Sequence, residues 1–272
     1  MTPIRPRLLH RAALLLLLLP LSASAIAVMQ AKPVEWKIGD QAFSGVLVYD
    51  DASSDKRPGL VMVPNWMGVG EDAIAMARRV AGDDYVVLVA DVYGAGIRPQ
   101  DDAQALAAVK QAWSDGGATL RKRARQAVEV LRTQEGLPLD ATRIGALGFC
   151  FGGGVVLELA RSGSDLAGGV VSFHGNLDSY RPVEGGIRTS ILVLNGADDK
   201  SVDAKQIAAF EQEMDAAGAD WQFVNFGGAR HCFSQPEDAD KPADGNCLYN
   251  ERAAGRAFRI MEGFFDERFG GD

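Results

Sequence analysis

The sequence predicts an α/β domain with a mostly parallel central β-sheet and helices on both faces. Short segments that are almost wholly apolar, such as residues 59–63 and 190–194, alternate along the chain with longer amphipathic segments. Strands that are apolar along their whole length are typical of parallel sheets covered by helices on both sides. The alternation of strand and helix favours a single α/β domain over separate all-β and all-α parts.

The elements follow one another in a regular order. A β-hairpin is expected first, with strands at residues 34–38 and 41–49 joined by the favourable turn pair Gly39-Asp40. Further strands are predicted where apolar runs are bounded by turn residues, at 59–63, 85–90, 143–147, 169–173, 190–194 and 221–226. Helices are predicted where apolar residues recur at helical spacing, at 71–81, 101–114, 119–134, 153–162, 203–217 and 250–268.

The N-terminus has the pattern of a secretory signal peptide. Three arginines precede the apolar run 12–19, and small residues with A-x-A patterns end at Ala25 and Ala27. We predict a signal peptide at residues 1–25, cleaved after Ala25 or Ala27, and a single domain at 34–269. An uncleaved N-terminal anchor is the alternative. The expected protein is exported, periplasmic in a Gram-negative source and otherwise secreted, with no membrane contact after cleavage.

Charge narrows the class of partner. The formal net charge is −8, and removal of the leader with its three arginines makes it about −11. Nucleic acids and anionic membranes are therefore poor partners, and a small molecule is expected instead. Gly94-Ala-Gly96 lacks the third glycine of a dinucleotide fingerprint, so no nucleotide cofactor is predicted. We expect a monomer or a small homo-oligomer.

The segment Gly148-Phe-Cys-Phe-Gly152 carries the strongest functional prediction. It lies between a predicted strand and a predicted helix, the context of a nucleophile elbow, in which the nucleophile occupies a sharp, strained turn. Glycines on both sides suit such a turn. Cys150 is the candidate nucleophile, and a helix N-terminus beside it favours its thiolate. The alternative is a buried structural cysteine.

A cysteine nucleophile needs a base and an acid that orients the base. The chain has three histidines, one of them in the leader, so His174 and His231 are the imidazole candidates. His231 follows the last predicted strand in a glycine-rich loop, and Asp198 follows another strand. We predict the set Cys150, Asp198 and His231, each at a strand end; neighbouring Asp199 is the alternative acid.

These residues resemble a known family. Gly148-x-Cys150-x-Gly152, Gly196-x-Asp198 and His231-x-Phe233, with upstream segments 63–68 and 90–93, are similar to the dienelactone hydrolases of the α/β-hydrolase fold. The resemblance spans about residues 34–269. It implies hydrolysis of small carboxylic esters or lactones through an acyl-cysteine intermediate. The resemblance also implies an oxyanion hole formed by the backbone N–H groups of Trp66 and Phe151. We predict no cofactor and no metal.

Two positions depart from the family's pattern. A glutamate that contacts the thiol in similar enzymes is replaced by Asn65, whose amide cannot accept a proton, so Cys150 must rely on His231 or on activation by the substrate. The arginine that holds a substrate carboxylate, a few residues after the histidine, is missing, which disfavours bidentate carboxylate recognition. The pocket candidates are Asn65, Met67, Tyr93, His174 and Phe233. Trp66, Met67, Tyr93 and Phe233 favour a more apolar pocket, although aromatic residues at strand ends can also belong to the core. For His174 the favoured alternative is a hydrogen-bonded structural residue behind the site.

Cys232 and Cys247 bracket a polar loop at residues 234–245. In an oxidising compartment they can pair and fix the chain beside His231, while two free thiols are the alternative. Cys232 and the histidines have the wrong spacing for a metal site.

Two other functions stay open from sequence. An α/β-hydrolase-fold protein that binds a ligand with weak or no catalysis is the first, motivated by Asn65. Thiol–disulfide exchange is the second, although no C-x-x-C pair surrounds Cys150.

Overall fold

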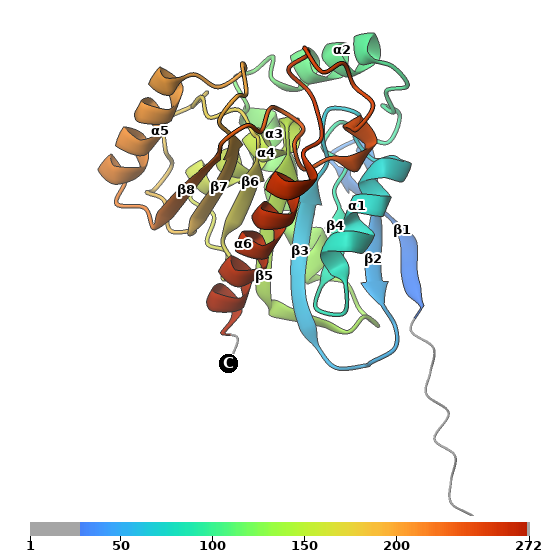
Figure 1. The fold of residues 1–272 in the computed structure, drawn as a ribbon. Helices are drawn as coiled ribbons and strands as arrows, with labels where there is room; N and C mark the ends of the chain where they lie inside the picture. Colours follow the sequence, from blue (N-terminus) through green and yellow to red (C-terminus); the bar gives the residue numbers. More distant parts are fainter. Residues whose placement is uncertain (1–27, 271–272) are drawn as a thin grey trace, which may run out of the picture.

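The computed structural model describes residues 28–270, so the predicted signal peptide lies outside the described residues. The central sheet has eight strands in the order β1-β2-β4-β3-β5-β6-β7-β8. The first two strands are β1 (Met29–Ile38) and β2 (Gln41–Asp50), which form the antiparallel hairpin at one edge (Figure 1). The remaining strands run parallel to one another: β3 (Arg57–Val63), β4 (Val86–Val89), β5 (Leu139–Phe149), β6 (Val170–Phe173), β7 (Ile191–Gly196) and β8 (Trp221–Phe226).

Helices cover both faces of the sheet, as the alternation of strand and helix predicts. One face carries α1 (Glu71–Ala81) and α6 (Glu251–Phe269). The other carries α2 (Asp102–Ala112), α3 (Ala118–Arg132), α4 (Phe151–Arg161) and α5 (Ala204–Ala216). Alternate residues of β3 serve the two cores: Val61 and Val63 pack with the second group of helices, and Leu60 and Met62 with the first. The central parallel strands are therefore mostly apolar because both of their faces are buried, whereas the edge strand β8 is partly exposed and carries Gln222 and Asn225.

The predicted fold class is confirmed, and the main differences lie at strand starts. β1 begins at Met29 instead of residue 34, and β5 at Leu139 instead of 143. Both extensions lack an apolar pattern, since β1 is a half-exposed edge strand and the start of β5 pairs with β3 across a register shift at Pro58/Gly59. Among residues 28–270, no helix is both long and apolar enough to cross a bilayer.

The parallel strands end at one edge of the sheet, and the candidate residues lie there. Cys150 follows β5, His174 follows β6, Asp199 lies just past β7, and His231 comes after β8. Because β5, β6, β7 and β8 are neighbours in the sheet, the fold gathers these side chains in space. This is the edge at which open α/β sheets bind ligands.

Candidate active site

Cys150 occupies the sharp turn between β5 and α4, the strand–turn–helix context that the sequence predicts. Its backbone has φ +53°, a left-handed conformation rare for a residue with a side chain. The turn is closed by contacts that exclude larger neighbours. A Cβ on Gly148 would lie 2.1 Å from the carbonyl oxygen of Gly152, and one on Gly152 would lie 2.0 Å from that of Val63. The glycines therefore let the backbone of α4 approach β3 and β5 at the elbow.

The thiol of Cys150 lies at the N-terminus of a buried helix. Every residue of α4 is buried, whereas Cys150 itself is partly exposed and free of disulfide bonding. The helix dipole and the unpaired N–H groups at its first turn stabilise an anion at this position. The free thiol is partly exposed and so lies where a substrate can reach it.

His231 connects Cys150 to a carboxylate. Its Nε2 lies 3.1 Å from Cys150 Sγ, and its Nδ1 lies 2.7 Å from Asp199 Oδ2. Burial works against protonation of the imidazole, but the Cys150 thiolate and the Asp199 carboxylate outweigh it and raise the pKa of His231 to about 10. Burial also opposes ionisation of Asp199, yet the hydrogen bond from His231 lowers its pKa to about 2. Cys150, His231 and Asp199 thus form one hydrogen-bonded row, in which the imidazole lies between the thiol and the carboxylate.

The acid of this row is Asp199, so the prediction of Asp198 is wrong. Asp198 is exposed, and its backbone N–H donates to the carbonyl of Ala229 at 2.8 Å. Asp199 is 4% exposed, and its side chain reaches the imidazole. Consecutive residues of the turn after β7 send their side chains in different directions, and only the second faces the strand end.

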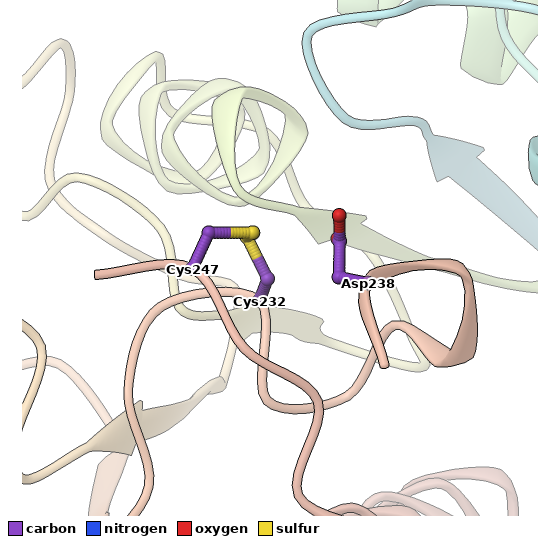
Figure 2. Close-up of side chains that lie close together, drawn as sticks. All are labelled: Cys232, Asp238 and Cys247. Carbon is purple, nitrogen blue, oxygen red and sulfur yellow. A yellow bond between two sulfur atoms is a disulfide. The ribbon is translucent and has the colours of Figure 1, made fainter. Parts of the chain in front are cut away.

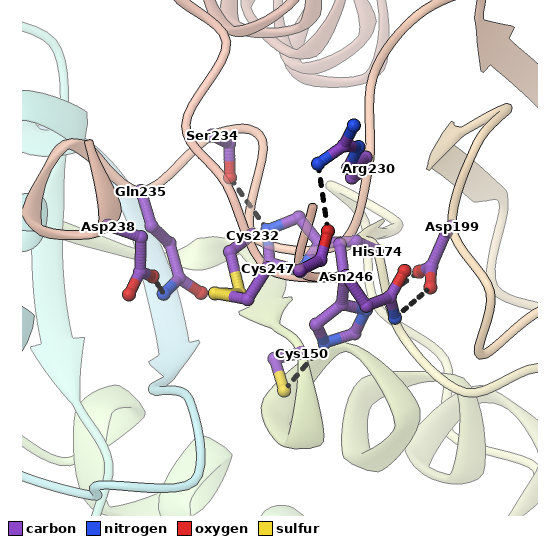
Figure 3. The surroundings of a disulfide bond; sticks show 12 residues. Cys150, His174, Asp199, Arg230, Cys232, Ser234, Gln235, Asp238, Asn246 and Cys247 are labelled. Carbon is purple, nitrogen blue, oxygen red and sulfur yellow. Dashed lines mark hydrogen bonds and ion pairs between the residues drawn. A yellow bond between two sulfur atoms is a disulfide. The ribbon is translucent and has the colours of Figure 1, made fainter. Parts of the chain in front are cut away.

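Asn246 is a member of the site that sequence reasoning missed. Its Nδ2 donates to Asp199 Oδ1 at 3.0 Å (Figure 3). The same Nδ2 donates to Ser201 Oγ at 2.9 Å. Its Oδ1 accepts from the backbone N–H of Lys200 at 2.8 Å. Asn246 therefore fixes the carboxylate that orients His231. Its place beside Cys247, a predicted disulfide partner, is the only sequence feature that could have drawn attention to it.

A disulfide joins Cys232 to Cys247, which leaves Cys150 as the free cysteine (Figure 2). His231 and Asn246 directly precede the two bonded cysteines, and the backbone N–H of Leu248 donates to the carbonyl of His231 at 3.1 Å. The bond therefore ties together the two segments that hold the base and the asparagine. A carboxylate oxygen of Asp238 lies within 4.8 Å of both sulfurs, which is close enough for the three residues to share a metal ion. The two sulfurs are bonded to each other, however, and so are not thiolate ligands.

The two residues predicted to form the oxyanion hole, Trp66 and Phe151, line the same cavity as Cys150. Among the described residues, the backbone N–H groups of Trp66 and Phe151 donate to no other protein group. Tyr93 supports both residues: its hydroxyl donates to the carbonyl of Trp66 at 3.0 Å, and its ring stacks on Phe151 with centroids 5.0 Å apart. Burial, and next the Cys150 thiolate, raise the pKa of Tyr93, so the phenol stays protonated and can donate.

Other predicted pocket residues divide into two groups. Asn65 and Met67 line the site, but Asn65 Oδ1 accepts from the backbone N–H of Met67 at 3.0 Å and so shapes its own loop. Tyr93 and Phe233 are buried behind the site and do not line its cavities, which corrects their prediction as pocket residues. Each packs on an aromatic or imidazole neighbour instead, because a ring at a strand end can complete the core as readily as a pocket.

Two cavities meet at Cys150 and His231. The smaller, about 310 Å³, has an aromatic and aliphatic wall formed by Trp66, Val109, Trp113, Phe151, Tyr180 and Val202. Tyr180 stacks on Trp113 with ring centroids 4.3 Å apart. Two buried arginines, Arg121 and Arg161, fix the loop that contains Tyr180. Both pair with Glu158, and each donates to a backbone carbonyl of that loop.

The larger cavity, about 700 Å³, is acidic. Its charged lining residues are Asp72, Asp102, Glu237, Asp238 and Lys241. Within residues 28–270, Lys241 is the only lysine or arginine that lines either cavity. Arg230, next to the histidine, donates instead to the carbonyls of Ala243 and Gly245. The arrangement can hold a substrate with an apolar group on one side and a neutral or cationic polar group on the other.

Comparisons with known proteins agree with this geometry. Residues 43–269 match the family described as the dienelactone hydrolase family. An uncharacterised protein of Caenorhabditis elegans is 35% identical over 159 residues, which cover 57% of this chain and 98% of that protein. The solved structure named m3DLH is 35% identical with a TM-score of 0.81, covering 88% of this chain and 98% of its own.

A second solved structure is a dienelactone hydrolase-like promiscuous phosphotriesterase from metagenomic libraries. It is 33% identical with a TM-score of 0.80, and the match covers 88% of this chain and 98% of that one. The family match, these two structures and the elbow lead to the same conclusion. The chain belongs to the dienelactone hydrolase family and is a hydrolase of the ester type.

Proposed function

We propose that this protein hydrolyses small carboxylic esters or lactones through an acyl-cysteine intermediate, with Cys150 as nucleophile, His231 as acid and base, and Asp199 as the orienting acid. The observation that carries the proposal is the hydrogen-bonded row: 3.1 Å from Cys150 to His231 and 2.7 Å from His231 to Asp199. Nucleophile, base and orienting acid at hydrogen-bond distances are the geometry that covalent acyl transfer requires.

The first half of the reaction forms the thioester. The Cys150 thiolate adds to the substrate carbonyl, and the resulting oxyanion accepts hydrogen bonds from the N–H groups of Trp66 and Phe151. As the carbon–oxygen bond to the leaving group breaks, the His231 imidazolium gives its proton to the departing alcohol. Loss of one oxyanion donor typically raises the barrier by about 3–4 kcal/mol.

The second half releases the acid. Neutral His231 takes a proton from water, whose oxygen attacks the thioester carbonyl while the same N–H groups hold the oxyanion. Breaking the carbon–sulfur bond regenerates the Cys150 thiolate beside protonated His231 and frees the carboxylic acid. The complete row favours this catalysis over ligand binding alone, and the bonding of Cys232 to Cys247 disfavours a thiol-exchange role.

A second candidate substrate class is neutral phosphotriesters. One relative with 33% identity is described as a promiscuous phosphotriesterase. The cavities suit such a substrate because it is uncharged and needs no cationic partner beyond the oxyanion donors.

Export through an N-terminal signal peptide is also proposed, and the Cys232–Cys247 bond supports it, since disulfides persist in oxidising compartments.

The test of function compares the unaltered protein with Cys150→Ala on activated aryl esters, lactones and neutral phosphotriesters. With the unaltered protein, quenching during turnover should give an acyl adduct that mass spectrometry places on Cys150. Cys150→Ala should unfold at the same temperature but form no adduct and show no turnover above background. Full ester turnover by Cys150→Ala would exclude the acyl-cysteine mechanism.

A further inference from the structure

His174 lies directly after β6, between the strands that bring Cys150 and Asp199 to the site. Its side chain is fully buried, and its backbone has φ +39°, one of three left-handed residues other than glycine among residues 28–270. Its backbone N–H donates to the carbonyl of Leu194 at 2.8 Å. Strained backbone at a site is held there by the surrounding structure and commonly accompanies function.

The ring of His174 has two neighbours from the loop that carries the base. Its Nε2 lies 2.9 Å from the hydroxyl of Ser234, three residues after His231 (Figure 3). Its ring meets that of His231 edge to face, with centroids 5.1 Å apart and planes inclined by 63°. Phe233 lies against it from a third direction, at 5.4 Å. His174 therefore contacts the His231 ring directly and forms a hydrogen bond with Ser234 in the loop that carries His231.

We propose that His174 is a positioning residue, which ties the His231 loop to β6 through Ser234 and holds the His231 ring in line between Asp199 and Cys150. The inference rests on the proposed function, because it concerns the base of that reaction. His174 forms no hydrogen bond with Cys150 or Asp199 within the described chain, and it contacts the row through the His231 ring. It also lines the smaller cavity, as the sequence predicts.

The choice of imidazole follows from charge. Burial, and next the charge on His231, keep the pKa of His174 well below its usual range, with Asp199 acting weakly the other way. His174 is therefore neutral while His231 is protonated. A neutral ring can hydrogen-bond to Ser234 without placing a second positive charge beside the imidazolium, which a lysine or arginine would do.

The other titratable groups that face His231 come from three elements. They are Cys150 at the start of α4, Asp199 after β7, and Asp238 in the short 3₁₀ helix Pro236–Asp238, whose own pKa is influenced by His231. His174 adds the edge-to-face contact of a second imidazole ring. Displacement of His231 would therefore show directly as a change in the ionisation of Cys150.

Two variants distinguish the hydrogen bond between His174 and Ser234 from the packing of the His174 ring. Ser234→Ala removes only the hydroxyl that His174 contacts, and His174→Phe keeps an aromatic ring among aromatic neighbours but loses the hydrogen bond. Ser172→Ala is the matched control, because Ser172 is another fully buried serine, on β6 itself, whose hydroxyl has no partner among the described residues. Thermal unfolding of each variant checks that it is folded.

The measurements are kcat, KM and the pH dependence of Cys150 alkylation by iodoacetamide, which needs no substrate. We expect Ser234→Ala and His174→Phe to lower kcat about 3- to 10-fold, the range that one neutral hydrogen bond provides, with KM nearly unchanged. Their alkylation profiles should shift toward that of an ordinary thiol, near pH 8.5. Ser172→Ala should match the unaltered protein in both readouts.

Wild-type kcat and alkylation profiles in both folded variants would overturn the proposal, as would an equal effect of Ser172→Ala. Ser234→Ala keeps the test decisive if His174→Phe does not fold. The outcome is separable from that of the function itself: ester turnover by Cys150→Ala would refute the acyl-cysteine reaction, whereas the alkylation profile reports on His231 whatever the substrate.

Discussion

Replacing Asp199 by asparagine is the sharpest test of the arrangement around His231, because its neighbour Asp198 offers a matched control. The two residues are adjacent and chemically identical, yet only Asp199 contacts the imidazole, at 2.7 Å. Asp199→Asn and Asp198→Asn make the same chemical change one position apart. Any difference between them therefore comes from geometry.

The expected size follows from the contacts of Asp199. A hydrogen bond to a charged group contributes about 1.5–3 kcal/mol, which corresponds to about 10- to 150-fold in rate. The asparagine can also present its N–H to Nδ1 and select the wrong tautomer of His231, an error that costs about 10⁴-fold in a serine protease. We therefore expect kcat/KM to fall by about 10²- to 10⁴-fold in Asp199→Asn and by less than about 2-fold in Asp198→Asn.

The assay is initial-rate hydrolysis of an activated aryl ester at neutral pH, with thermal unfolding recorded on the same samples. Asp199→Asn should remain folded, since an amide oxygen can still accept from the backbone N–H of Ser201, now 2.8 Å from Asp199 Oδ1. Equal losses in both variants, or a larger loss in Asp198→Asn, would refute the assignment of Asp199.

Two further predictions concern the disulfide and the cavities. Replacing Cys232 and Cys247 by serine opens a loop with a sequence separation of 15; by chain entropy this costs about 3 kcal/mol, so calorimetry should find Tm lower by roughly 6–12 °C, and an unchanged Tm would contradict the clamp. For substrates, a neutral aryl ester should exceed its carboxylated analogue in kcat/KM by at least about tenfold, because like charges across an interface repel. Added salt should reduce the ratio of the two kcat/KM values. Equal kcat/KM values at low salt would show that the acidic lining of the larger cavity does not discriminate against a carboxylated substrate.

The sheet could be predicted from sequence because its strands are buried on both faces. Apart from Ser172 and Ser190, the runs 59–63, 169–173 and 190–194 consist of apolar residues and glycine, and short runs of this kind between amphipathic helices are typical of parallel strands. The start of β1 could not be placed, because Met29–Pro33 belongs to an exposed edge where no apolar pattern is needed. A proline such as Pro33 is tolerated on such an edge and does not end the strand.

The residues of the candidate site likewise fall into those that the sequence identifies and those that it does not. Cys150 and His231 are identifiable because glycines mark the elbow and histidine is scarce in this chain. The choice between Asp198 and Asp199 depends on side-chain direction within one turn, which composition does not encode. Asn246 lies in a loop without regular structure, 47 residues from the carboxylate that it holds, so neither periodicity nor spacing could relate the two.

The elbow around Cys150 separates the shape of the site from its chemistry. Gly148 and Gly152 determine the path of the backbone through contacts with other backbone atoms, and the tip of the side chain at position 150 takes no part in those contacts. A hydroxyl could therefore replace the thiol without moving the oxyanion donors or His231. A single substitution at position 150 would therefore replace one nucleophile, a thiol, by another, a hydroxyl. Any side chain at position 148 or 152 would instead clash with the backbone and disrupt the turn that holds either nucleophile.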